Sequence, residues 1–179
     1  MAADYKELEK NLTDVVKEFQ MKIGYSKHSM SLYYMKDSLE RLLGITADEK
    51  NMEKVLEDFS KYSENIFKGI KTSYKDNRFC ITIPAEGVEY IHKTVPDSQF
   101  LKLFLSTVTK HDISINDIAN VFKKFSENVC CKEIKNDDFD YVIYFTDGIP
   151  DEYIYCVKFE NCHATYHRFT KKEFDAFGF

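Results

Sequence analysis

Residues 139–169, FDYVIYFTDGIPDEYIYCVKFENCHATYHRF, constrain the fold more than any other part of the chain. The segment is dense in aromatic and β-branched residues, and turn-forming residues interrupt it at 147–150 and 161–162. This pattern is typical of consecutive antiparallel strands. A further strand, VCCKEIKN at 129–136, precedes it and ends at a turn at 137–138. We therefore predict a four-stranded antiparallel meander in the C-terminal part of the chain.

The rest of the chain is dominated by helical periodicity. Apolar residues recur at the spacing of one helix face, and capping residues or glycines mark the helix ends. The predicted helices are 4–22, a short one closed by Gly44, 48–67, 97–111, 114–128 and 170–177. The apolar stripe of the first helix includes Phe19 and Ile23, which we expect to face the core.

Two connecting segments complete the predicted fold. An alternating segment around Asp76 and Asn77 predicts a separate hairpin near residues 70–83. The segment between the first two helices is expected to be a loop rich in tyrosine, and it includes His28. The predicted class is α+β, with helices packed on one face of the C-terminal meander. We expect a single compact domain over 1–179, which is an ordinary domain length.

Charge and cysteine content restrict the functional class. The net charge is −5, which is the wrong sign for a protein whose main partner is nucleic acid. The N-terminal segment is charged from Asp4 onward and contains no apolar signal region, and no apolar run is long enough to span a bilayer. Five cysteines at scattered spacings suit reduced thiols better than disulfides. We therefore expect a cytoplasmic protein with no membrane partner.

The last predicted hairpin brings chemically useful residues together. If Asn161 and Cys162 form a two-residue turn, the strand register follows. Cys156 then faces His167 across the two strands. The pairs Glu160–His163 and Lys158–Thr165 lie on the same face. The opposite face carries the more apolar residues that a helix could cover, namely Tyr155, Val157, Phe159, Ala164, Tyr166 and Arg168.

A cysteine beside a histidine can act as a nucleophile. The imidazole stabilises the thiolate, which is the reactive form of the side chain. We therefore take Cys156 and His167 as the candidate catalytic pair. The candidate binding residues are His163, Glu160, Lys158, Asp147, Asp151 and Arg168. A solvent-facing strand also needs polar residues, so the same pattern fits a surface without chemistry.

Other recognisable sites are absent from the sequence. Cys162, His163 and His167 do not complete a metal-ligand spacing, so we predict no metal site. No glycine-rich phosphate loop and no Gly-x-Ser-x-Gly turn occurs. The cofactor, if there is one, stays open.

One arrangement points weakly to nucleic acid. Two consecutive helices at 97–111 and 114–128, followed by a hairpin, have the order of a winged helix-turn-helix domain. The second helix would read the bases, but its polar residues are only weakly basic in sum: Asn116, Asn120, Lys123 and Lys124 against Asp117 and Glu127.

Three segments together resemble a known bacterial family. They are Ile23-Gly24-Tyr25, the run from Leu32-Tyr33-Tyr34 through Ser38-Leu39 to Leu42-Leu43-Gly44, and Tyr155-Cys156 with Tyr166-His167-Arg168-Phe169. The chain is similar over nearly its whole length to the uncharacterised family named domain of unknown function 3877. Members often have Tyr-Tyr-Pro where this chain has Tyr34-Met35, so that turn differs. The resemblance implies no activity and no catalytic residue.

Three functional hypotheses remain. The first is a module that binds another protein or a small molecule, because no catalytic motif is complete. The second is an enzyme that uses Cys156 and His167. The third, and the one we favour least, is a winged-helix-like nucleic-acid binder. The sequence leaves the ligand and the oligomeric state open.

Overall fold

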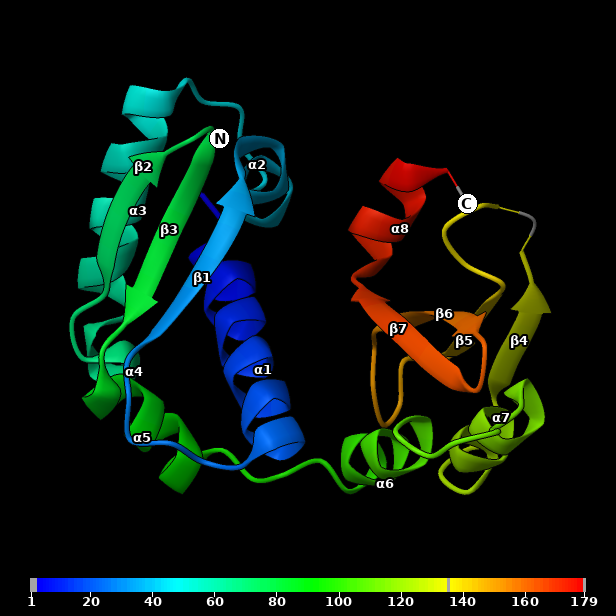
Figure 1. Ribbon diagram of the computed structural model, residues 1–179. Helices are drawn as coiled ribbons and strands as arrows, with labels where there is room; N and C mark the ends of the chain where they lie inside the picture. The colour runs from blue at the N-terminus through cyan, green and yellow to red at the C-terminus, as the bar shows by residue number, and fades with distance from the viewer. Residues whose placement is uncertain (1–2, 135, 179) are drawn as a thin grey trace. The chain divides into compact units, whose positions relative to one another are not determined.

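The computed structural model describes residues 3–134 and 136–178, and within them the chain has eight helices and two antiparallel sheets (Figure 1). The α+β class and the C-terminal meander are therefore confirmed. The backbone contacts divide the chain into two compact units, 1–97 and 98–179, and each is described by itself. That these units make up one compact domain stays a prediction.

The first unit combines five helices with a three-stranded sheet. Its elements, in chain order, are α1 (Tyr5–Ile23), β1 (Met30–Met35), α2 (Lys36–Leu43), α3 (Glu49–Tyr62), α4 (Glu64–Phe67), β2 (Lys71–Lys75), β3 (Arg78–Ile83) and α5 (Ala85–Thr94). The strands lie in the order β1-β3-β2, and all pairs are antiparallel.

The predicted hairpin near 70–83 is confirmed, and it belongs to this sheet and not to the C-terminal one. Asp76 and Asn77 form its turn, and both have positive φ (51° and 59°), as a tight two-residue turn requires. The expected loop between the first two helices is only partly correct, because residues 30–35 form β1. Their alternating burial turns Met30, Leu32 and Tyr34 toward the helices.

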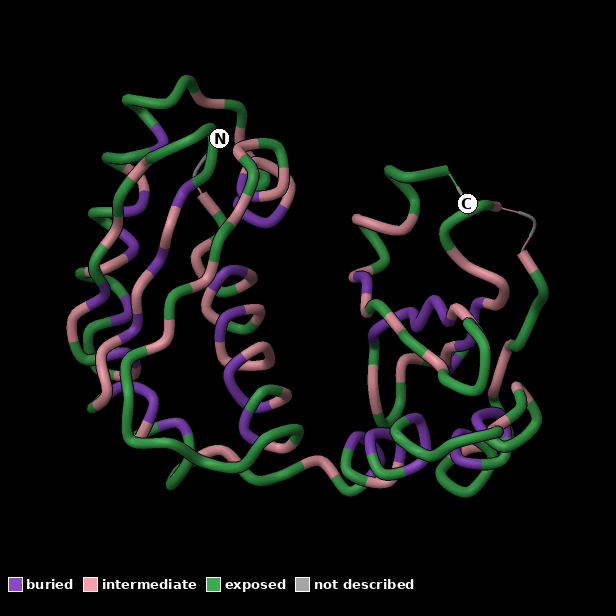
Figure 2. Tube along the Cα trace, in the orientation of Figure 1, coloured by how far each residue is buried: buried purple, intermediate pink, exposed green. Residues whose placement is uncertain are grey.

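The core of the first unit lies on one face of its sheet. Phe79, Ile81 and Ile83 of β3 are fully buried, and apolar side chains of α1, α2, α3 and α5 pack with them. Buried positions recur along these helices in the Cα trace (Figure 2). Gly87 in α5 lets this helix approach α4 closely, since a Cβ there would lie 2.2 Å from the carbonyl oxygen of Phe67.

The second unit places helices on both faces of a meander. Its elements are α6 (Gln99–Val108), α7 (Ile115–Lys123), β4 (Val129–Glu133), β5 (Tyr141–Phe145), β6 (Ile154–Glu160), β7 (His163–Phe169) and α8 (Lys171–Phe177). The strand order is β4-β5-β6-β7, with every pair antiparallel.

Aromatic rings join the first two helices of this unit to the sheet. Phe104 of α6 and Phe122 of α7 both contact Tyr155 of β6, at ring-centroid distances of 4.7 and 5.4 Å. A smaller apolar cluster lies around Cys156 and includes Val142, Ile154 and Phe169, with Phe174 of α8 packed against it. The sheet face that sequence reasoning left to solvent is therefore partly covered.

Candidate functional site

The register of the last hairpin agrees with the prediction. Asn161 and Cys162 form the turn, and Cys156 lies directly opposite His167. The pairs Lys158–Thr165 and Glu160–His163 also match. The two-residue turn and the alternation of side chains along each strand were sufficient to predict which residues face each other.

Burial limits what Cys156 can do chemically. Its side chain is fully buried in the small apolar cluster, and the absence of water raises the pKa of the thiol to about 11. His167 is exposed, and its ring lies against Phe169 at a centroid distance of 4.2 Å. The cross-strand pair therefore exists, but its cysteine is held in the neutral form.

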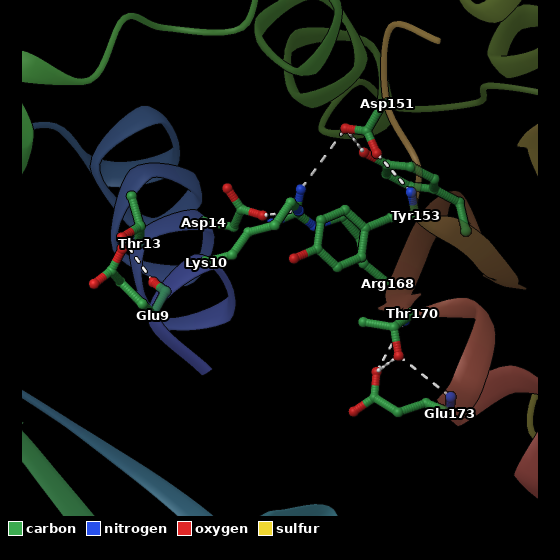
Figure 3. Close-up of polar contacts among 10 residues, drawn as sticks. Glu9, Lys10, Thr13, Asp14, Asp151, Tyr153, Arg168, Thr170 and Glu173 are labelled. Carbon is green, nitrogen blue, oxygen red and sulfur yellow. Dashed lines mark hydrogen bonds and ion pairs between the residues drawn. The ribbon is translucent and has the colours of Figure 1, made fainter. Parts of the chain in front are cut away.

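Asp151 and Arg168 come together in a polar cluster (Figure 3). It lies on the face of the meander that is opposite Cys156 and His167. The Tyr155 hydroxyl donates a hydrogen bond to Asp151 Oδ2 at 3.0 Å, and Arg168 Nη1 lies 4.0 Å from the same oxygen. The Arg168 guanidinium also lies over the Tyr153 ring, 4.5 Å from its centroid. Burial, and then the charge of Asp151, raises the pKa of Tyr155 well above its usual value. The cluster joins the segment before β6 to β7 and is well suited to a structural role.

The other candidate binding residues lie at separate places in the unit. Lys158 forms an ion pair of 3.0 Å with Asp140. The Asp140 carboxylate also accepts a hydrogen bond from the backbone of β6. Asp147 Oδ2 accepts a hydrogen bond from the side chain of Asn128. His163 is at the hairpin tip, where its ring contacts His111. Glu160 is exposed beside that tip.

Residues 3–134 and 136–178 contain neither a candidate metal-binding cluster nor a candidate membrane-spanning helix. In that part of the chain, no group of three or more His, Cys, Asp or Glu side chains is placed to hold a metal ion. None of the helices formed there combines the length and the apolar character needed to cross a bilayer.

The first unit contains a cavity that the sequence did not reveal. Its volume is about 420 Å³, and it lies between the C-terminal half of α1, the following loop, β1 and the start of α5. The lining is mostly apolar, with a few hydroxyl groups, one imidazole and one amide: Val15, Phe19, Gln20, Ile23, Gly24, Ser26, His28, Ser29, Met30, Ser31, Leu32 and Val88.

The amide in this lining is buried and half satisfied. The side chain of Gln20 is only 7% exposed, and its Nε2 donates a hydrogen bond to the carbonyl oxygen of Val88 at 3.1 Å. Gln20 Oε1 is buried and accepts no hydrogen bond from the residues that the structure describes. A buried acceptor in this state is costly, so a hydrogen-bond donor would be favoured beside it.

One ring contact and one hydrogen bond involve the loop that lines the cavity. Tyr25 stacks on His92 of α5, with ring centroids 4.2 Å apart. Ser26 Oγ and His28 Nδ1 are joined by a hydrogen bond of 2.5 Å. The expectation that Phe19 and Ile23 face the core is wrong, because they are 45% and 66% exposed and instead line the cavity.

A second hollow is larger but less suited to a ligand. It has a volume of about 570 Å³ beside α2, and most of its lining is charged or polar: Asp37, Glu40, Arg41, Gly44, Ile45 and Thr46. The carboxylate of Glu40 already accepts hydrogen bonds from Lys36 Nζ and from the backbone of Ala47. These contacts lower the pKa of Glu40, and its carboxylate already has hydrogen-bond partners within the protein.

Comparison with known proteins places the chain in a family. No curated protein and no solved structure matches the chain. A family model described as "Domain of unknown function, E. rectale Gene description (DUF3877)" matches residues 5–178, which confirms the resemblance seen in the sequence. The chain therefore belongs to the DUF3877 family.

Proposed function

We propose that the protein is a binding module and that the cavity of the first unit holds a small, mainly apolar ligand. The observation that carries this proposal is the cavity lining, in which apolar side chains surround one buried amide. Its volume of about 420 Å³ is within the range of roughly 300–1,000 Å³ that is typical of small-molecule sites.

The polar groups of the lining indicate what the ligand carries. Gln20 Oε1 is a buried acceptor without a partner among the described residues, so a ligand with an N–H or O–H group would supply the missing hydrogen bond. Ser26 and His28 offer further polar contacts in the loop. The ligand that fits best is an apolar ring or chain with one donor group.

The enzyme hypothesis is the weaker one. Nucleophilic attack by Cys156 requires a thiolate, and burial disfavours that form. For partners, the net charge of −5 argues against nucleic acid. We place the protein in the cytoplasm, since all five cysteines are free of disulfides.

Fluorescence of N-phenyl-1-naphthylamine tests the proposal, because this uncharged aromatic probe is apolar and carries one N–H donor. We expect saturable fluorescence enhancement on the folded wild type, and its loss in Val15→Trp, which fills the cavity. Val55→Trp is the matched control, since Val55 is also a half-buried helical valine but does not line the cavity.

A second variant separates loss of the site from loss of the fold. Gln20→Leu keeps the size of the side chain and removes the amide, so we expect weaker probe binding with unchanged circular dichroism. Equal binding by wild type, Val15→Trp and Gln20→Leu would place the probe elsewhere and refute the proposal. Failure of the folded wild type to bind would refute it as well.

A further inference from the structure

The outward face of the three-stranded sheet has an unusual composition. Alternation along the strands turns nine side chains away from the core, and the register arranges them in three rows across the sheet. The rows are Ser31–Thr82–Lys71, Tyr33–Cys80–Ser73 and Met35–Arg78–Lys75. We refer to these nine residues as the outer face.

Positive charge is segregated on the outer face. It carries Lys71, Lys75 and Arg78 and no carboxylate, although the whole chain has a net charge of −5. None of the three cations forms an ion pair with a residue in the described part of the chain. All three are exposed.

Two of these cations are placed unfavourably for the isolated protein. Lys75 and Arg78 are directly opposite each other on neighbouring strands. Side chains at such positions lie about 5 Å apart at Cβ, and like charges there destabilise a sheet. An anion bound over this pair would relieve the repulsion, and the arrangement therefore favours an anionic partner.

Large apolar side chains lie beside the cations. Tyr33 is 65% exposed and Met35 is 51% exposed, and Met35 is the cross-strand neighbour of Arg78. Tyrosine, methionine and arginine are among the residue types that are enriched at protein–protein interfaces. Their presence together on one sheet face indicates a protein rather than a lone ion as the partner.

We propose that the outer face docks an acidic, extended segment of a partner protein. Carboxylates of that segment would meet Lys75, Arg78 and Lys71, and its apolar side chains would cover Tyr33 and Met35. An extended chain suits this surface, because its alternating side chains match the spacing of the rows. Nucleic acid fits less well, since three cations on a protein of net charge −5 neutralise few phosphates. This proposal does not depend on the cavity.

Fluorescence anisotropy with the fluorescein-labelled decapeptide Glu-Ser-Leu-Ser-Glu-Ser-Leu-Ser-Glu-Ser tests the proposal, because an extended chain with this pattern presents Glu and Leu on the same side. We expect saturable binding to the wild type that weakens with added salt. The variant Lys75→Gln/Arg78→Gln should bind at least tenfold more weakly, and Tyr33→Ser should bind severalfold more weakly. Lys50→Gln/Lys54→Gln is the matched control, because it removes the same charge from exposed positions of α3 and should bind as the wild type does.

Melting temperature provides a readout besides binding. Lys75→Gln/Arg78→Gln should melt no lower than the wild type, because it removes a like-charge contact, so its loss of binding cannot result from unfolding. A labelled twelve-residue oligouridine is the competing probe. The proposal is overturned if the peptide does not bind the wild type, if the control variant loses as much affinity as the outer-face variant, or if oligouridine binds more tightly than the peptide.

Discussion

Alkylation of Cys156 distinguishes a structural thiol from a catalytic one. Burial raises the pKa of this thiol from an ordinary 9.0 to about 11. At pH 8 the thiolate fraction is then about 0.001, whereas a thiol of ordinary pKa has about 0.1. Ionisation alone therefore predicts that Cys156 reacts with iodoacetamide about 100-fold more slowly than an ordinary thiol. Full burial adds to this factor, since the reagent must wait for local opening of the sheet.

The assay uses two variants that each retain one cysteine. One keeps Cys156, and the other keeps Cys162, which is exposed in the turn of the same hairpin. Mass spectrometry of time points at pH 8 gives both rates in the folded protein, and the rates should become equal in denaturant. His167→Ala should change the Cys156 rate less than twofold, because burial is the cause of the raised pKa. A Cys156 rate near that of Cys162, reduced by His167→Ala, would refute this reasoning and favour the enzyme hypothesis.

Two further predictions concern stability. Gly87→Ala should lower the free energy of unfolding by about 1–3 kcal/mol or more, because the new Cβ would lie 2.2 Å from the Phe67 carbonyl oxygen and the backbone must shift. Urea denaturation measures this change, and an unchanged midpoint would contradict the close packing of α4 and α5. Asp140 has a pKa lowered by the Phe159 N–H and by Lys158, so its stabilising contribution is present above its unfolded pKa and is lost as the pH falls through the folded one. Asp140→Asn should therefore lose less stability than the wild type between pH 6 and pH 3, and an identical loss would contradict that assignment.

Local pattern was sufficient for several parts of the fold. The β6–β7 register followed from alternation and from the two-residue turn at 161–162, since a slip by one residue would turn every side chain to the other face. The Asp76–Asn77 turn was found for the same reason, because both residue types tolerate positive φ. Sheet membership could not be found in this way. The β2–β3 hairpin pairs with β1, which is more than 30 residues away, and no local pattern specifies that contact.

The cavity was missed for a related reason. Helical periodicity showed that Phe19 and Ile23 share a face with the core residues of α1, but it could not show that the core ends before them. Among the residues that the structure describes, none buries these two side chains, which are 45% and 66% exposed. Instead, the segment 24–29 passes over that end of the helix, held to α5 by Tyr25 stacked on His92. An apolar stripe thus becomes a cavity wall where the chain leaves the core.

The candidate catalytic pair shows how far register determines chemistry. Period-two alternation placed Cys156 and His167 on one face, but the reactivity of the thiol depends on whether water reaches that face. Water is excluded by the side chains that pack around Cys156. They are the cluster residues Val142, Ile154 and Phe169, and the surrounding Ile134, Phe139, Tyr144 and Phe174, the last of which belongs to α8. The sequence predicted α8 from its Thr170 cap, and the capping box with Glu173 is present, but a cap fixes where a helix begins and not what it covers. Register alone therefore does not separate the enzyme hypothesis from the binding one, because the segments packed against β6 and β7 decide whether water reaches the thiol.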